Sequence, residues 1–402
     1  MAGVFENDRG KIMKNNRLLI VGDASSIFIY NYVKALKEQT DYHVTVYSPI
    51  KDRHTYIEYP YDEVVYDKYF NSFVSRLPFF GTRLLSYFVR RNFSIFLRQF
   101  NKYYDIIHFH WILPCWVINS SEYKKYARYV GATLWGGEVE TLKLFNSQKL
   151  YRKQLGFFFN NIDFNISSGP KPELNKKYPI LEKISYYGIY GSSIIEEISR
   201  NKQSTEEAYS IYGIDKEKIT VLIGYSGKTI HHHCEILKKI QEYPLFKEYQ
   251  HKIHFLASMS RGATDSYVKK VENAMISTGC TYTMITGYQS DKEVASFRIA
   301  TKVAFQLSDF DGLSNSIKEI LTAGSYLICG DWVGDYYILK KNGFRYQEVS
   351  SFDQGIKEFY NYLAAPTSKE QWINQNMSVG RNQFSWTECI KSWIKVYKHF
   401  ME

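Results

Sequence analysis

The sequence lacks the cysteine patterns that build disulfide frameworks or zinc sites. Its five cysteines are scattered along 402 residues and include no CxxC pair: Cys115, Cys234, Cys280, Cys329 and Cys389. This spacing indicates neither a zinc site nor a set of disulfides, so we interpret the cysteines as reduced cytosolic thiols.

Long apolar stretches are also missing. No window contains the run of about eighteen uncharged apolar residues that a membrane-spanning helix needs, and the N-terminal residues contain no signal-peptide core. We therefore expect a cytoplasmic protein. The chain has no internal repeat, and 402 residues are enough for two domains with a sizeable core.

The charge balance favours anionic partners. The formal net charge is +10 and the isoelectric point is near 9.0. Nucleoside diphosphates, an anionic membrane surface and nucleic acid would all suit such a charge. No RNA- or DNA-binding motif is present, so we do not expect nucleic acid as a partner.

Acidic residues are absent from Phe70 to Tyr104, where arginines alternate with aromatic residues and leucines. A basic amphipathic helix of this composition can lie in a membrane interface with its arginines near anionic headgroups. An amphipathic helix that packs on a sheet and leaves its arginines in water is the alternative. Both interpretations fit the sequence.

The strongest functional pattern lies between Leu307 and Asp331. An apolar strand from Lys302 to Leu307 leads into an acidic loop, and a helix is expected to start near Ser314 to Ser316 and to end at Gly324. A second apolar strand follows. This order is typical of a parallel α/β sheet, which binds ligands just beyond the carboxyl ends of its strands.

Asp311, Gly312, Leu313, Ser314 and Glu319 resemble the acidic signature of retaining glycosyltransferases of the GT-B fold, in the GT4-like group. In that group an acid precedes a Gly-Leu pair and a small residue, and a Glu follows eight positions after the first acid. The first acid is usually Glu, and here it is Asp. The resemblance implies that Asp311 contacts hydroxyls of the donor sugar and that Glu319 holds the ribose diol.

The start of the same helix is the expected site of the diphosphate. The resemblance places the backbone amides of Ser314, Asn315 and Ser316 against it, since a helix N-terminus offers free N–H groups and the positive end of the helix dipole. Ser316 and Glu319 also spell a capping box, in which the glutamate only satisfies an amide at the helix start.

The strand from Asp105 to Trp111 (DIIHFHW) resembles the segment that ends at the interdomain cleft in this family. His108 and His110 alternate with apolar residues and so point to one face of the sheet. His110 is nearer the carboxyl end, and we predict it as a catalytic residue in the cleft. A histidine in a strand can equally be a hydrogen-bonded core residue.

Gly131 to Glu140 (GATLWGGEVE) resembles the strand and loop that carry a donor-contacting histidine in the family. Trp135 stands at the position of that histidine, which puts the usual contact with the sugar in doubt. Glu138 occupies the family's acidic position and is a candidate for positioning the acceptor hydroxyl. It could instead cap the following helix.

Lys228 is the expected cation for the diphosphate. It follows the strand Lys218 to Ile223, where the family usually carries a Gly-Arg pair, and here the arginine is absent. Gly227 frames the same loop, and Arg261 in the next strand's loop is a second candidate. A generic turn and a solvated arginine are the alternatives.

Further residues come from the neighbouring loops. The resemblance places Tyr288 near the nucleobase and Gly334 at the donor pocket. His231, His232 and His233 are consecutive, so they point to different faces of a helix and do not suggest a metal site. We interpret them as helix-entry residues.

The sequence predicts an α/β protein of the GT-B fold, with two Rossmann-like domains whose parallel sheets face a central cleft. Residues 1–195 form the acceptor domain and residues 196–384 the donor domain, with a helix at 385–402 crossing back. We expect a retaining, metal-independent transfer from a UDP- or GDP-linked sugar, with no other cofactor.

The expected acceptor is a lipid-linked saccharide at the inner face of the cell membrane, in the assembly of a surface polysaccharide such as capsule or O-antigen. A GT-B nucleotide-sugar epimerase and a non-catalytic nucleotide-sugar-binding module are the alternatives. The departures at Asp311 and Trp135 prevent the sugar from being inferred from relatives.

Overall fold

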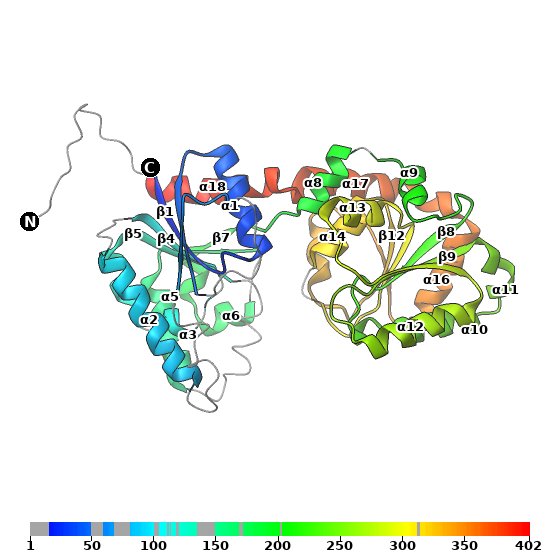
Figure 1. Ribbon diagram of the computed structural model, residues 1–402, viewed down its shortest axis with the longest axis horizontal. Coiled ribbons are helices and arrows are strands. Elements are labelled where there is room, and N and C mark those ends of the chain that lie inside the picture. Colours follow the sequence, from blue (N-terminus) through cyan, green and yellow to red (C-terminus); the bar gives the residue numbers. More distant parts are fainter. Residues whose placement is uncertain are drawn as a thin grey trace, which may run out of the picture. The chain divides into compact units, whose positions relative to one another are not determined.

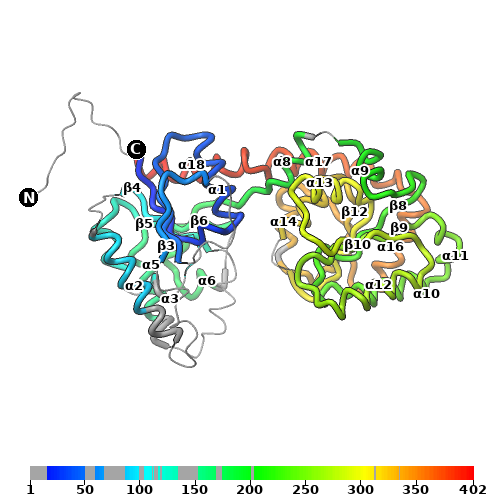
Figure 2. Tube along the Cα trace, viewed as in Figure 1, coloured from blue at the N-terminus to red at the C-terminus, as the bar shows by residue number. Residues whose placement is uncertain are grey.

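The chain forms two compact units, each built on one parallel sheet. A computed structural model describes residues 16–49, 59–67, 81–99, 104–110, 112, 114–117, 120–134, 149–168, 172–201, 203–311 and 314–402. Unit 1 comprises Met1–Tyr190 with Cys389–Glu402, and unit 2 comprises Gly191–Glu388. The chain therefore passes between the units twice, and its course can be followed in Figure 2. Residue 195, the expected boundary, lies within α8 (Ser193–Asn201), which packs on helices of unit 2.

Unit 1 has a seven-stranded sheet in the order β3-β2-β1-β4-β5-β6-β7. The strands are β1 (Arg17–Val21), β2 (His43–Ser48), β3 (Glu63–Tyr66), β4 (Tyr104–His110), β5 (Ala127–Thr133), β6 (Phe164–Ser167) and β7 (Ser185–Tyr187). All neighbouring pairs are parallel. The central strands are apolar and buried along nearly their whole length, because helices cover both faces of the sheet.

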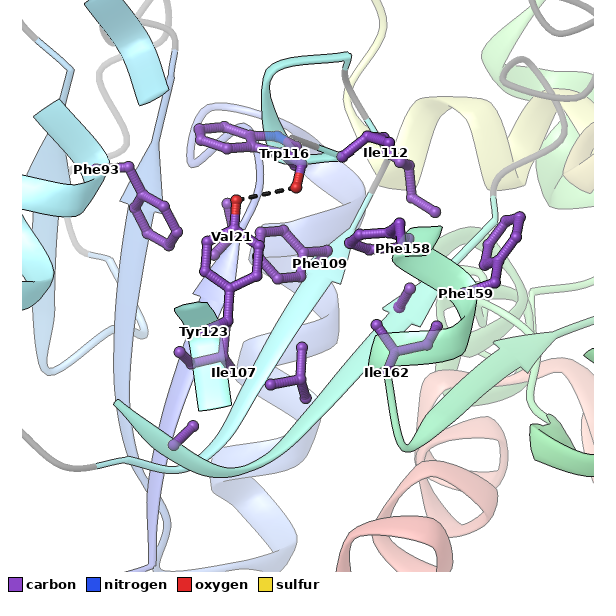
Figure 3. Close-up of a cluster of buried hydrophobic side chains, with 14 of the residues drawn as sticks. Val21, Phe93, Ile107, Phe109, Ile112, Trp116, Tyr123, Phe158, Phe159 and Ile162 are labelled. Atoms are coloured by element: carbon purple, nitrogen blue, oxygen red, sulfur yellow. Dashed lines mark hydrogen bonds between the residues drawn. The ribbon is translucent and has the colours of Figure 1, made fainter. Parts of the chain in front are cut away.

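The helices of unit 1 form a layer on each face of this sheet. They are α1 (Ile27–Gln39), α2 (Gly81–Gln99), α3 (Pro114–Val117), the 3-10 helix η2 (Ser120–Lys125), α5 (Lys149–Asn161), α6 (Pro172–Lys177), α7 (Ile180–Ile184) and α18 (Trp386–Met401). Helices α2, α3 and α5 lie on one face and α1 and α18 on the other (Figure 1). Figure 3 shows the core under α2, α3 and α5, where Phe93, Phe109 and Phe158 pack together. The Tyr123 hydroxyl donates to the Trp116 carbonyl there at 2.9 Å.

Helix α2 contributes its apolar face to this core. Val89, Phe93, Phe96 and Leu97 are buried. Exposed positions of the same helix carry Tyr87, Arg91, Ile95 and Arg98. For residues 87–98 the helix is therefore an amphipathic helix packed on the sheet. Other parts of the basic segment, residues 70–80 and 100–103, lie outside the described residues.

Among the helices that the structure describes, none combines the length and the apolar character needed to cross a bilayer.

Unit 2 has a six-stranded parallel sheet in the order β10-β9-β8-β11-β12-β13. The strands are β8 (Ile219–Ile223), β9 (Ile253–Ser258), β10 (Thr281–Ile285), β11 (Val303–Gln306), β12 (Tyr326–Gly330) and β13 (Gln347–Val349). Because all the strands are parallel, the loops that follow β8, β9, β11 and β12 all lie at the edge where the carboxyl ends of the strands meet.

Helices again cover both faces of this sheet. Besides α8 they are α9 (Thr205–Ile211), α10 (His233–Glu242), α11 (Phe246–Tyr249), α12 (Asp265–Thr278), α13 (Asp291–Ile299), α14 (Asn315–Thr322), α15 (Tyr337–Lys341), α16 (Phe352–Ala364) and α17 (Glu370–Phe384), with the 3-10 helices η4 (Thr229–His231), η5 (Gln250–Lys252), η6 (Gly334–Tyr336) and η7 (Pro366–Lys369). Helices α10 and α12 lie on one face, while α8, α13, α14 and α17 pack together on the other (Figure 1). This second layer positions the candidate site.

Candidate functional site

Asp311 lies at the turn between β11 and α14, and one of its carboxylate oxygens is held by three donors. Oδ2 accepts from the Tyr225 hydroxyl at 2.8 Å, from Gln306 Nε2 at 2.9 Å and from the Tyr336 hydroxyl. These donors come from the loop after β8, from β11 itself and from η6 after β12. All hydrogen bonds that the described residues make to this carboxylate reach Oδ2. They fix the orientation of the carboxylate and leave Oδ1 for another partner.

The two tyrosines at Asp311 are held in their protonated form. Burial raises the pKa of Tyr225, and the nearby charge of Asp311 raises it further. The same two causes, in the same order, raise the pKa of Tyr336. Both hydroxyls therefore stay protonated at neutral pH and donate to the carboxylate.

Gly334 brings the loop after β12 against the backbone of Asp311. Its φ angle is +44°, in the left-handed region, and a Cβ atom at this position would lie 2.5 Å from the carbonyl oxygen of Asp311. Only glycine fits this approach. The structure therefore brings the predicted residue Gly334 directly to Asp311.

Helix α14 starts two residues earlier than a capping box at Ser316 would require. Ser314 is the N-cap, and its hydroxyl accepts from the backbone N–H of Ser316 at 3.1 Å. The capping-box alternative for Ser316 and Glu319 is therefore wrong. The side chain of Asn315 donates to the Gly191 carbonyl at 3.4 Å.

Gly312 and Leu313, the other two predicted residues of this turn, lie outside the described residues.

Glu319 faces the interior of unit 2 and is paired with a buried arginine. The residue is 6% exposed, Arg298 on α13 is 5% exposed, and Glu319 Oε2 lies 3.6 Å from Arg298 Nε. Glu319 Oε1 accepts from the Ser192 hydroxyl at 2.8 Å. Burial lowers the pKa of Arg298, and the charge of Glu319 opposes this shift. Within the described part of the chain, Arg298 Nε and Nη1 have no hydrogen-bond partner.

Lys228 and Arg261 lie on two loops that are joined directly. The N–H of Gly227 donates to the carbonyl of Arg261 at 2.9 Å. A Cβ atom on Gly227 would lie 2.5 Å from the Cβ of Ala263, so the two backbones need glycine here to approach so closely. Both cationic side chains are exposed at the edge of the sheet where β8 and β9 end. The structure thus brings the two predicted cations to adjoining loops.

The three consecutive histidines do not converge. His231 Nε2 lies 2.9 Å from the Ser226 hydroxyl, and His233 Nδ1 lies 3.1 Å from the Tyr267 hydroxyl. Burial lowers the pKa of His231 to about 4 and that of His233 to about 3, so both are neutral at pH 7. Across the described ranges, no group of three or more His, Cys, Asp or Glu residues is arranged to hold a metal ion.

Tyr288 follows β10 and is 88% exposed. Its predicted role at the nucleobase stays a prediction.

His110 is buried in the core of unit 1 rather than open at the end of its strand. It is 1% exposed, its ring stacks on Trp393 with centroids 5.7 Å apart, and its Nδ1 is bonded to the Tyr190 hydroxyl. Burial lowers the pKa of His110 well below its usual range, and nearby His108 lowers it further. The structure therefore agrees with the alternative that His110 is a hydrogen-bonded core residue. Its catalytic role stays a prediction. Glu138 and Trp135 lie outside the described residues.

Unit 1 contains a cavity of about 350 Å³ that the sequence gave no reason to expect. Asn165, Asn175, Glu182, Ser185 and Tyr187 are among its lining residues. Asn165 is 2% exposed, and its Nδ2 donates to the Ser185 hydroxyl at 3.1 Å. Its Oδ1 is buried and has no hydrogen-bond partner among the residues described. An amide oxygen in this position can accept from a ligand hydroxyl.

Sequence reasoning found Asp311 and Glu319 but not the residues that hold them. Ser192, Arg298 and Tyr336 carry no local signal, because each reaches the site only through the fold. Gln306 was the one detectable partner, since a polar residue inside the apolar strand from Lys302 to Leu307 needs a hydrogen-bond partner when the strand is buried.

Comparison with known proteins identifies the fold. The sequence matches no protein-family model and no curated protein sequence. The structure is similar to sucrose-phosphate synthase from Thermosynechococcus elongatus, with a TM-score of 0.70 and 11% identity over 95% of this chain and 98% of that one. It is similar to Anabaena HepE in complex with UDP, with a TM-score of 0.63 and 11% identity over 95% and 100% of the chains.

A third similar structure is the UDP-GlcNAc 2-epimerase from Neisseria meningitidis bound to UDP-GlcNAc, with a TM-score of 0.61 and 13% identity over 95% of this chain and 99% of that one. Together with the two parallel α/β units, these similarities show the GT-B fold with two Rossmann-like domains. The predicted fold class is confirmed.

Proposed function

We propose that the protein is a glycosyltransferase that moves a sugar from a nucleoside-diphosphate sugar to a hydroxyl of an acceptor. The observation that carries the proposal is the fixed carboxylate of Asp311, which belongs to the Asp311–Glu319 signature and lies where a strand of a GT-B sheet ends. Similar structures that contain UDP or UDP-GlcNAc support a nucleotide sugar as the donor.

The proposed donor site lies on unit 2. Asp311 Oδ1 accepts from a hydroxyl of the donor sugar, and Glu319 accepts from the ribose diol. The start of α14 and the cations of Lys228 and Arg261 stabilise the diphosphate, since helix N-termini and cations favour negative charge. UDP and GDP are the proposed leaving groups.

We propose that the transfer retains the anomeric configuration and needs no enzyme nucleophile, metal ion or further cofactor. The bond between the anomeric carbon and the diphosphate oxygen breaks, and the acceptor oxygen bonds to that carbon from the same face. The acceptor proton leaves with the diphosphate. Catalysis then comes from positioning and from stabilising the charge that develops on the leaving group.

Nucleotide binding tests the donor site. Thermal denaturation with UDP, GDP, dTDP and CMP should show one nucleoside diphosphate raising the Tm by about 5 °C at about a hundredfold excess over its Kd. Glu319→Gln keeps the shape of the side chain but removes its charge, and should abolish this shift. If none of the four nucleotides raises the Tm of the wild type, the proposed function is wrong.

The epimerase alternative is favoured by one observation, the similarity to the UDP-GlcNAc 2-epimerase. Incubation with the nucleotide sugar whose base binds, followed by NMR, separates the candidates. A transferase releases the nucleoside diphosphate when an acceptor is added. An epimerase changes the configuration of a sugar that stays attached to the nucleotide, and a non-catalytic binding module does neither.

We further propose that the acceptor is a lipid-linked saccharide at the inner face of the cell membrane, in the assembly of a surface polysaccharide. The exposed arginines of α2, Arg91 and Arg98, support contact with anionic headgroups. The cavity at Asn165 supports saccharide binding in unit 1, because its lining combines amides, hydroxyls, a carboxylate and an aromatic ring. The protein would then be cytoplasmic and peripherally bound.

Anionic vesicles that carry a lipid-linked saccharide test this proposal in one experiment. The double variant Arg91→Glu/Arg98→Glu should co-sediment with them at least about tenfold more weakly, because each basic residue near the surface contributes about 1 kcal/mol. Asn165→Leu should co-sediment like the wild type but incorporate little sugar. Equal co-sedimentation of the wild type and the arginine variant would contradict membrane contact through α2.

A further inference from the structure

The carboxylate of Glu319 already has a hydroxyl partner inside the protein. The Ser192 hydroxyl donates to Glu319 Oε1 at 2.8 Å. The Glu319 side chain is 8% exposed, so a ligand hydroxyl has little room at the carboxylate while Ser192 stays in place. A ribose hydroxyl would donate to the carboxylate in the same way. The two hydroxyls therefore require the same position.

Of the two partners of Glu319, Ser192 is the one that can leave. Displacing the guanidinium of Arg298 would leave two buried charges uncompensated, which is strongly destabilising. Ser192 is neutral, and its departure removes one hydrogen bond. Its hydroxyl oxygen also lies 3.4 Å from the backbone N–H of Ile195 in the first turn of α8, so it keeps a partner after it leaves Glu319.

The backbone holds Ser192 beside Glu319 without help from the side chain. The N–H of Ser192 donates to the Phe384 carbonyl at 3.0 Å, and its carbonyl accepts from the N–H of Glu196 at 3.3 Å. Asn315, at the start of α14, donates to the preceding carbonyl of Gly191 at 3.4 Å. The hydroxyl is therefore fixed close to Glu319, and a rotation of the side chain is enough to release the carboxylate.

We propose that the Ser192 hydroxyl is an internal competitor that sets the affinity of unit 2 for a ligand diol. It occupies Glu319 in the unliganded protein and is released when the vicinal diol of a ribose binds the carboxylate. The inference rests on the proposed nucleotide-binding function. Removing the polar side chain of Ser192 from the site should therefore tighten nucleotide binding and not weaken it.

Calorimetric titration with UDP, or with GDP if UDP does not bind, measures this effect. Ser192→Ala should lower the Kd about tenfold, since one hydrogen bond to a charged group no longer has to be broken. Ser192→Thr keeps a hydroxyl and should bind like the wild type. Ser204→Ala is the matched control, because Ser204 is the N-cap of α9 in the same unit and its hydroxyl accepts from Glu207. Its Kd should not change.

The dependence on Glu319 separates competition from a general loosening of the fold. In a Glu319→Gln background, which should not bind the nucleotide, the further change Ser192→Ala should not restore binding. If Ser192→Ala does not fold, Ser192→Gly replaces it, because Ser192 directly precedes α8 and glycine is well tolerated at the position before a helix. If the wild type binds the nucleotide and the Kd of Ser192→Ala is unchanged or higher, the inference is wrong while the proposed function stands. If the wild type binds neither nucleotide, the proposed function has failed, and the inference falls with it.

Discussion

Lowering the pH from 7 to 5 is expected to destabilise the protein strongly, because burial holds five histidines neutral. Burial lowers the pKa of His108 and His233 to about 3 and that of His231 and His254 to about 4, and it lowers the pKa of His110 well below the usual range. In the unfolded chain each would titrate near about 6.5. Below that pH the unfolded state binds more protons than the folded state, so the free energy of unfolding falls as the pH falls.

The expected loss is large compared with the stability of a domain. For each buried histidine, the free energy of unfolding falls by about 1.4 kcal/mol for every pH unit below about 6.5. The loss at pH 5 is therefore about 2 kcal/mol for each histidine. Unit 1 contains two of the five and unit 2 contains three, so they lose about 4 and about 6 kcal/mol. Domains are stable by only about 5–15 kcal/mol. The loss continues until the pH reaches the folded-state pKa values near 4 and 3.

Urea denaturation at pH 7, 6 and 5 measures this dependence. His254 bonds to the Thr281 and Thr283 hydroxyls at 2.9 Å each, and His254→Gln should reduce the pH slope by about 1.4 kcal/mol per unit. His251→Gln, at an exposed position of the same unit, should leave the slope unchanged. Added salt should restore little stability, whereas a large restoration would indicate repulsion within the net charge of +10. Equal stability at pH 7 and pH 5 would show that the histidines are accessible to protons.

Most of the fold could be predicted from the sequence because its central strands are apolar runs bounded by turns. The strands expected from Lys302, Asp105 and Lys218 begin within one residue of those positions, at Val303, Tyr104 and Ile219. The edge strands β3 and β13 were not predicted. Their four and three residues are only partly buried, so they carry no apolar run to distinguish them from a loop.

Within the candidate site, the sequence could predict only the residues that lie close together along the chain. Asp311 and Glu319 stand out because their spacing, the intervening glycine and the turn between two strands are all visible along the chain. Tyr225 and Tyr336 do not stand out among 35 tyrosines, since only the fold brings both hydroxyls to Asp311. His108 and His110 do share one face, as their alternation predicts, with ring centroids 4.3 Å apart. The sequence could not show that this face is covered by Trp393 of α18.

Arg298→Met is expected to destabilise unit 2 by about 3–5 kcal/mol, because it leaves Glu319 as a buried carboxylate without a compensating charge. Glu319→Met should cost a similar amount by leaving the guanidinium unpaired. Arg298→Met/Glu319→Met removes both charges and should return to within about 1 kcal/mol of the wild type, since apolar side chains of similar volume often replace a buried ion pair without loss. Urea denaturation of the four proteins closes this double-mutant cycle.

The same four proteins separate the two reasons for which such a pair can be present. If the pair contributes mainly to stability, the double variant should stay destabilised by about as much as either single variant. If it is present to bind a ligand, the double variant should fold as stably as the wild type and yet show no Tm shift with the nucleotide that shifts the wild type. We expect the second result. Arg298 Nε and Nη1 lack hydrogen-bond partners within the described residues, and such buried unpaired donors make the ion pair a poor contributor to stability. A stable double variant that still binds the nucleotide would place the ribose away from Glu319.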